Sequence, residues 1–230
     1  TILFGIDITE RKDVEEALKQ ARKKLNLLNF VTFQEIQNSV FSLAAFLDLM
    51  ETTPGCTDGG TGYISKEKAL ISKITNLLNF AKDYQDLGVY PPRWQIVGHI
   101  FLLAISHLDF LSIQRNVHLD NLEIYADSLL EKAFFNMMEN VLVHGVRVTE
   151  VNLSYYETTG GLVLVIEDNG VGVAPKYKKD LFDRGFGKNT GLGLFLVREI
   201  LSLTGISIQE TGEEGKGARF EISIPKGAFR

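Results

Sequence analysis

Apolar residues recur at helical spacing through the first third of the chain. From Thr9 to about Met50 there is no Pro or Gly, and the spacing predicts one helix of roughly forty residues, far above the usual length of about 11–12. A turn-rich loop follows at Thr52–Gly62, and the same spacing over Ser65–Leu87 predicts a second helix. Ahead of both, Thr1–Ile8 alternates like a short strand.

The two long helices predict a helical hairpin. Its apolar residues lie on several faces, and one antiparallel neighbour cannot cover so much apolar surface. We therefore expect two copies of the chain to pair as a dimeric four-helix bundle. A monomeric helical subdomain is the alternative.

The pattern changes after Gly88–Pro92, a predicted linker, because short alternating strands then interleave with shorter helices. Strands are expected near Trp94, His118 and Leu122–Tyr125, and at Val151–Tyr156, Leu162–Glu167, Ile206–Glu210 and Arg219–Ile224. Helices are expected from Val97 to about Leu111, from a cap at Asp127 to about Val143, and over Leu192–Leu203. This order predicts an α+β sandwich with helices on one face of a mixed sheet.

Composition excludes some classes of protein. A net charge of −5 and a pI of about 5.5 argue against a nucleic-acid partner, which needs a basic face. The single Cys56 cannot form an internal disulfide, in keeping with a reducing compartment. No apolar run reaches the ~20 residues that span a bilayer. The best candidate, Ile96–Ile113, is interrupted by His99, His107 and Asp109, so we expect no membrane segment in this chain.

Three polar side chains share one face of the predicted helix that ends near Val143. Asn136, Asn140 and His144 stand at positions i, i+4 and i+8 of an otherwise apolar segment. A carboxamide oxygen can bind Mg²⁺ while its nitrogen reaches a phosphate oxygen. The alternative is that these side chains are solvated or bonded within the core.

Glycines follow an acidic residue at the end of a predicted strand. Gly170 and Gly172 come after Asp168 and allow the backbone to turn tightly beside a flat ring. The Asp168 carboxylate can accept a hydrogen bond from an exocyclic amine, which would select adenine. As an isolated motif, the segment is also compatible with a simple turn.

A second glycine-rich segment leads into the last predicted helix. Such a loop presents backbone N–H groups and the positive end of a helix dipole to phosphate. Lys188 adds a charge, and Phe182 and Phe186 can hinge the loop as a lid or simply pack in the core. The glycines of this segment are Gly185, Gly187, Gly191 and Gly193, and Gly215 and Gly217 would let the last hairpin pass the same ligand.

In their order, these segments resemble the N, G1, G2 and G3 boxes of sensor histidine kinases of the GHKL ATPase superfamily. Phe182–Phe186 resembles the F box of that family, and the hairpin resembles its dimerisation and phosphotransfer domain. Asp7–Arg11 looks like the junction after a PAS sensor domain. The run Arg184–Leu194 is similar to archaeal-type members in particular.

The resemblance implies a domain order and a set of ligands. It implies the end of a PAS-like domain at 1–9, a signalling linker helix at 10–24, the helical hairpin at 25–88, a linker at 89–92 and an ATP-binding domain of the Bergerat type at 93–230. The implied cofactors are ATP and Mg²⁺, with Asn140 as the metal ligand. The residues implied to bind nucleotide are Asn136, Asn140, His144, Asp168, Gly170, Gly172, Lys188, Gly191, Gly193 and Gly217.

The implied biology is a two-component pathway with a phosphorelay. The expected partners are a second copy of the chain and a response-regulator receiver domain, in the cytoplasm, with a parent protein that can be membrane-anchored. Hydrolysing members of the superfamily carry a glutamate at the position of Asn136 to activate water. Because Asn136 is no base, this chain resembles the kinase branch.

The chain departs from the kinase pattern at the phosphoacceptor. Aligning Phe33–Ser39 with the acceptor box puts Glu35 on its acidic position and Gln34 where the histidine belongs. A carboxamide nitrogen is neither basic nor nucleophilic, whereas imidazole is both. We therefore expect no autophosphorylation on the hairpin. A smaller departure is Val143, where many relatives carry a cation facing the phosphates.

Several alternatives stay open. The chain can be a natural pseudokinase or an engineered His-to-Gln variant, or its acceptor can lie elsewhere. In a different class, it can be a non-catalytic scaffold that docks a receiver domain or heterodimerises with an active kinase. A serine kinase of the anti-sigma type shares the ATP fold but does not need the long hairpin.

Overall fold

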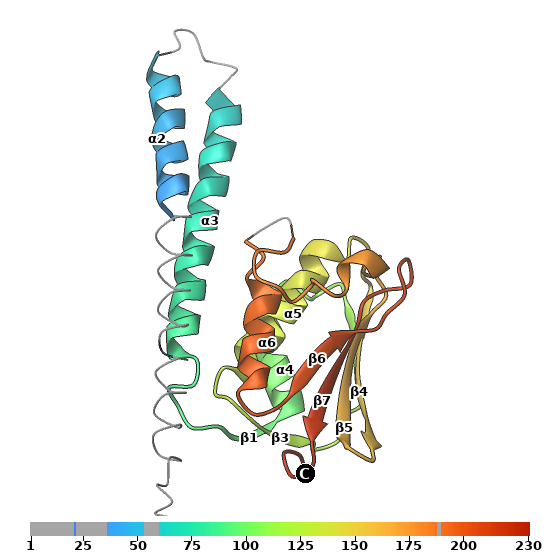
Figure 1. The fold of residues 1–230 in the computed structure, drawn as a ribbon. Helices are drawn as coiled ribbons and strands as arrows, with labels where there is room; N and C mark the ends of the chain where they lie inside the picture. Colours follow the sequence, from blue (N-terminus) through green and yellow to red (C-terminus); the bar gives the residue numbers. More distant parts are fainter. Residues whose placement is uncertain (1–20, 22–35, 53–59, 188–189) are drawn as a thin grey trace, which may run out of the picture. The chain divides into compact units, whose positions relative to one another are not determined.

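The computed structural model describes residues 21, 36–52, 60–187 and 190–230, and the chain divides into two compact units between Gln85 and Asp86 (Figure 1). In the first unit, α2 spans Ile36–Thr52 and α3 spans Gly60–Asp86. Both segments are helical as expected, although α3 begins at Gly60 rather than Ser65. Glycine is tolerated there because the first turn of a helix has few intrahelical bonds to lose. The pairing of these helices, within one chain or between two, stays a prediction.

Several expectations fall on residues outside those described. They concern the strand at 1–8, the helix from Thr9 up to residue 35, and most of the loop before α3. Among the helices that are described, none is both long and apolar enough to cross a membrane.

The second unit is built on a five-stranded mixed sheet with the order β2-β4-β5-β7-β6. The edge strand β2 runs parallel to β4, and the other neighbours are antiparallel. The strands are β2 (Gln114–Val117), β4 (Glu150–Thr158), β5 (Gly161–Asp168), β6 (Ser207–Glu210) and β7 (Arg219–Pro225). Alternating apolar residues thus predicted these strands correctly.

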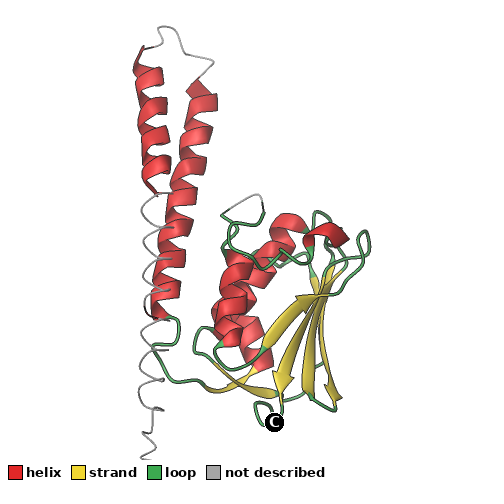
Figure 2. Ribbon diagram, in the orientation of Figure 1, coloured by secondary structure: helices red, strands yellow, loops and turns green. Residues whose placement is uncertain are grey.

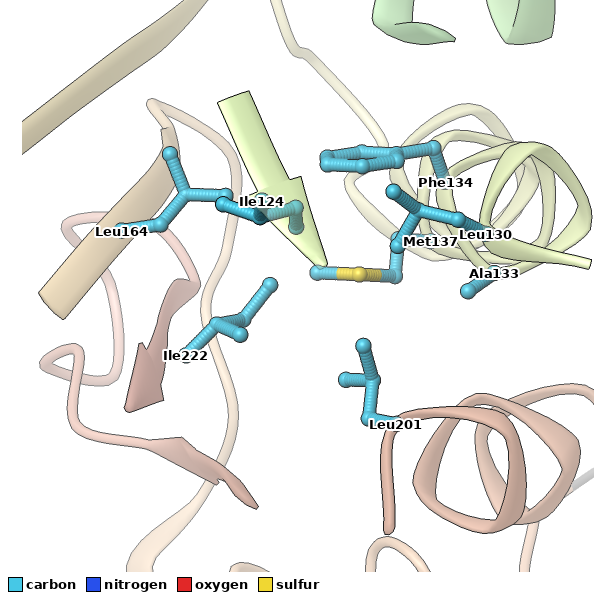
Figure 3. A pocket seen from close by; sticks show the side chains of 8 residues that line it. All are labelled: Ile124, Leu130, Ala133, Phe134, Met137, Leu164, Leu201 and Ile222. Atoms are coloured by element: carbon cyan, nitrogen blue, oxygen red, sulfur yellow. The ribbon is translucent and has the colours of Figure 1, made fainter. Parts of the chain in front are cut away.

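Helices cover one face of this sheet (Figure 2). They are α4 (Val97–Ser106), α5 (Leu130–His144) and α6 (Gly193–Ser202), and a short 3₁₀ turn, η2, spans Pro175–Tyr177. The core lies between the helices and the sheet. A gap of about 10 Å³ lies within it. Its lining is entirely apolar and includes Met137, Leu164 and Leu201 (Figure 3). A gap of this size and polarity is a packing defect of the core and no ligand site.

A second, two-stranded sheet pairs β1 (Arg93–Ile96) with β3 (Glu123–Ala126). The buried Gln95 side chain donates to the backbone oxygens of Ala126 at 3.1 Å and Asp127 at 2.9 Å. Gln95 thereby fixes the segment that leads into α5, the helix that carries Asn136 and Asn140.

Two predicted helix boundaries were wrong. Helix α4 ends at Ser106 and not near Leu111, because the chain turns there and Leu108 N bonds to Ile105 O at 3.0 Å. Asp127 is not the N-cap of α5. It is buried in a turn before the helix, where its Oδ1 accepts from Leu129 N at 2.9 Å, and the N-cap is Leu129.

Candidate functional site

The last residue of β5, Asp168, places a buried carboxylate beside two backbone turns. Asp168 is 6% exposed, and its N–H donates to Ala218 O at 3.0 Å. Its Oδ1 accepts from Gly170 N at 2.8 Å and from Ala218 N at 3.3 Å. Among the described residues both side-chain bonds end on Oδ1, so Oδ2 is the atom that can receive a donor from a ligand.

The environment of this carboxylate disfavours its charge. Burial is the largest effect and raises the pKa of Asp168 above its ordinary value of 3.8. The N–H groups of Gly170 and Ala218 oppose this rise, while the charges of Glu210 and Glu167 add to it. The fold therefore keeps an acidic group where a neutral one would be more stable, which is typical of a site kept for function.

Two backbone turns meet at Asp168 more closely than any side chain would permit. The first is the turn between β6 and β7, where a Cβ added at Gly217 would lie 1.8 Å from Asp168 O. The second is the loop after β5, where a Cβ at Gly172 would lie 2.7 Å from Gly217 O. Gly215 N also donates to Val171 O at 2.7 Å. The glycines of the two predicted motifs thus fit one against the other.

The end of α5 joins the same cluster through Gly145. A Cβ at Gly170 would lie 2.6 Å from Gly145 O, and Val171 N donates to that oxygen at 3.3 Å. His144 is exposed at the last position of α5. The loop after β5 is therefore held between the end of α5 and the turn before β7.

The asparagines of α5 face the start of α6. Asn136 is buried, and its Nδ2 donates to Gly193 O at 3.3 Å. Asn140 Nδ2 donates to Asn136 O at 2.9 Å, which leaves Asn140 Oδ1 available to a ligand as far as the described residues reach. No described side chain caps the N-terminus of α6. Its first N–H groups and the helix dipole therefore suit an anion.

The two ends of the glycine-rich segment before α6 contact each other at Gly185 and Gly191. Gly185 N donates to Gly191 O at 3.1 Å, and a Cβ at Gly191 would lie 2.4 Å from the Gly185 carbonyl carbon. The flanking aromatics differ, because Phe182 is buried edge-on against Phe220 whereas Phe186 contacts Tyr177 near the surface. Phe182 thus packs in the core.

The structure brings most predicted site residues to one end of the second unit, in two adjoining groups. Gln34, Glu35 and Lys188 lie outside the described residues. The first group is Asp168, Gly170, Gly172 and Gly217, with His144 at the adjacent end of α5, and the second is Asn136, Asn140, Gly191 and Gly193.

Sequence reasoning missed Gly145 and Ala218. Both act through backbone atoms, and a backbone contact leaves no pattern of side-chain types. Asn169 was also missed. Its side chain bonds to the N–H groups of Thr149 at 2.9 Å and Glu150 at 3.1 Å and so ties the loop after β5 to the start of β4.

The part of the chain that contains this site matches a known protein family. Residues 126–228 match the family described as histidine kinase-, DNA gyrase B- and HSP90-like ATPase. This part of the chain is an ATPase domain of that family. All of the paired glycines above, both asparagines and Asp168 fall within the matched range.

Curated relatives extend the match along the chain. The sensor protein CitS of Halalkalibacterium halodurans is 26% identical over 96% of this chain and 40% of its own length. The sensor protein SrrB of Staphylococcus aureus is 26% identical over 96% of this chain and 41% of its own length. The sensor kinase/phosphatase CqsS of Vibrio cholerae is 32% identical over 50% of this chain and 17% of its own length. The chain thus spans about two-fifths of CitS and SrrB.

Solved histidine kinases share the fold. The kinase ThkA, in complex with the response regulator protein TrrA, aligns with a TM-score of 0.65 at 16% identity over 97% of this chain and 69% of its own. The kinase AdeS of Acinetobacter baumannii aligns with a TM-score of 0.61 at 16% identity over 84% of this chain and 98% of its own. At these identities the likeness concerns the fold alone.

The backbone contact at Gly217 leads to a first prediction. Gly217→Ala forces a Cβ into the Asp168 carbonyl and pushes the β6–β7 turn away, so we expect nucleotide affinity to fall by about tenfold or more. Gly215→Ala is the matched control, because Gly215 also has a positive φ (87° against 128°) but has open space around it. Fluorescent-nucleotide titration of both variants measures this. Equal losses in the two would mean that the close approach is not what matters.

The raised pKa of Asp168 leads to a second prediction. A carboxyl whose pKa is higher in the folded state destabilises the fold above that pKa, and the cost vanishes as pH falls toward the unfolded value of 3.8. Asp168→Asn keeps the Oδ1 acceptor and removes the charge. We expect the ligand-free variant to resist urea better than wild type at neutral pH, with the difference shrinking in acid.

The same variant should bind ATP more weakly. Its new amide nitrogen would face the amine of adenine, and two donors cannot bond to each other. A variant that is less stable than wild type at neutral pH and binds ATP equally well would contradict both parts of the prediction.

Proposed function

We propose that this chain is the ATP-binding core of a sensor histidine kinase in a two-component pathway. The proposal rests on one observation. The groups that suit a purine and the groups that suit a magnesium-bound triphosphate lie in adjoining parts of the domain that matches the ATPase family.

Each part of the nucleotide has a partner in this arrangement. Asp168 Oδ2 accepts the adenine amine, beside the backbones of Gly170, Gly172 and Gly217. At the other end, the N-terminus of α6 with Gly191 and Gly193 receives phosphate oxygens, and Lys188 adds a charge. His144, at the end of α5 beside the first group, adds a polar contact. Bound Mg²⁺ would neutralise the phosphate charge.

The metal has one fitting ligand on α5. Asn140 Nδ2 is bound to a backbone oxygen, which turns Oδ1, a hard oxygen that Mg²⁺ prefers, toward solvent or ligand. Asn136 is engaged with Gly193 O and supports the phosphate end. Neither asparagine can remove a proton from water, so we propose slow ATP hydrolysis.

We extend the proposal to the parts of the chain that the ATPase family does not cover. The segment 25–88 forms a homodimer and docks a response-regulator receiver domain, and ThkA, of similar fold, is a histidine kinase in complex with a response regulator. Residues 1–9 are the C-terminal end of a PAS-like sensor domain and residues 10–24 a signalling linker helix, in a kinase of archaeal type. The linker at 89–92 joins them to the ATP-binding domain at 93–230.

A more specific part of the proposal concerns the phosphoacceptor position. With Gln34 in place of histidine and Glu35 as the neighbouring base, the hairpin accepts no phosphoryl group. The same substitution favours a second candidate, a scaffold that docks a receiver domain without using ATP.

Calorimetry with a non-hydrolysable ATP analogue separates the two candidates. The kinase-core proposal predicts saturable binding that weakens when Mg²⁺ is removed with a chelator. The scaffold predicts no heat of binding under either condition. Absence of binding in a folded protein would overturn the kinase-core proposal.

Gln34→His tests the acceptor alignment. Because imidazole is nucleophilic, we expect this variant to gain an acid-labile, alkali-stable phosphoryl mark from radiolabelled ATP, while wild type gains none. Gln37→His, a histidine placed one helical turn further on, is the matched control and should gain none. A mark on wild type or on the control would show that the alignment is wrong.

A further inference from the structure

An ion pair between a buried carboxylate and a partly buried ammonium contacts the turn between β6 and β7. Glu210, the last residue of β6, has a side chain that is 0% exposed, and its Oε2 lies 2.8 Å from the Lys178 ammonium, whose side chain is 22% exposed. Burying two charges costs more free energy than an apolar pair would, unless geometry and further hydrogen bonds compensate. The Glu210 carboxylate therefore needs its cation and the hydrogen bonds around it.

Both members of the pair also hold backbone atoms of the β6–β7 turn. Glu210 Oε1 accepts from Gly212 N at 3.0 Å on one side of the turn and from Arg219 N at 3.2 Å on the other. Lys178 Nζ donates to Gly212 O. The pair thus holds together the two sides of the turn at Gly212 and Arg219, which we call its neck. It also ties the neck to the segment that follows Gly172.

Arg219, on one side of this neck, follows directly after the residue whose N–H bonds to the Asp168 carboxylate. Arg219 N is bound by Glu210, and the preceding Ala218 N donates to Asp168 Oδ1 at 3.3 Å. Gly217, the next residue back, is the one that touches Asp168 O. A shift of the neck therefore moves the donor that orients the Asp168 carboxylate. The charge of Glu210 also reaches Asp168 and raises the pKa of its carboxyl.

We propose that Lys178 and Glu210 are positioning residues that set the selectivity of the site for adenine. Neither touches the nucleotide. They hold the turn so that Asp168 Oδ1 is occupied by Ala218 N and Oδ2 faces the base. The proposal rests on the proposed function, because it refines how that site chooses its base.

The test compares two nucleotides in Lys178→Met. Inosine triphosphate carries an oxygen where ATP carries the amine, and an N1–H where adenine has an acceptor, so the ratio of the two affinities reports the contacts with that edge of the base, the Asp168 contact among them. We expect the preference for ATP to fall by about tenfold, the equivalent of one charge-assisted hydrogen bond, with the affinity for inosine triphosphate little changed. Lys179→Met, an exposed lysine at the next position, is the matched control and should keep the wild-type ratio.

A second variant guards against misfolding. Lys178→Met leaves the Glu210 charge buried without a partner, whereas Lys178→Met with Glu210→Gln buries no charge and keeps the Oε1 acceptor for the turn. We expect the double variant to be folded and still to lose the preference, because the tie through Lys178 is absent. A folded variant with a lower melting temperature and an unchanged ratio would make the pair merely structural. If wild type itself binds neither nucleotide, the proposed function fails, and this inference fails with it.

Discussion

The structure of the site depends on how closely two backbones approach each other. Asp168 ends β5, and Gly217 precedes β7, the antiparallel neighbour of β5. Their backbones meet where a Cβ added at Gly217 would lie 1.8 Å from Asp168 O. Only glycine permits this contact. It brings Ala218 N to the Asp168 carboxylate and closes the loop of Gly170 and Gly172 over it. The site proposed for a base thus consists of main chain and one acidic side chain.

The phosphate end follows from the two-sided character of α5. One side of this helix is part of the apolar core with Phe134 and Met137, and another presents Asn136 and Asn140 to the start of α6. The core fixes the distance between the two helices, and the asparagines occupy the edge of that contact. The same packing that stabilises the domain therefore sets the geometry of the end that we propose for a metal-bound phosphate. A polar stripe on an otherwise apolar helix could not be exchanged for apolar residues without losing that geometry.

Much of the second unit could be predicted from sequence, because alternation is a strong signal in strands with one buried face. The hairpin of β4 and β5 and the helix α6 agree with expectation within a few residues. The end of α4 did not, since apolar residues up to Leu111 continue the spacing after the chain has turned. The N-cap of α5 was also placed wrongly, at Asp127. In sequence, an aspartate just before a helix looks the same whether it caps the helix or lies in a buried turn ahead of it.

Glycine, asparagine and aspartate marked the candidate site in the sequence, and the structure brings these residues close together, while their role in binding stays a prediction. Each segment alone resembles a simple turn, and only the order of the segments carries information. The pairing of Lys178 with Glu210 could not be predicted, because the two charges are distant in sequence and only the fold brings them together. Nor did sequence single out Gly145, whose contribution is a carbonyl oxygen.

The most direct test of this account is a crystal structure of the chain with a non-hydrolysable ATP analogue and Mg²⁺. The account predicts the adenine amine within hydrogen-bonding distance of Asp168 Oδ2 and the metal on Asn140 Oδ1. A purine bound elsewhere, with Asp168 facing water, would contradict it.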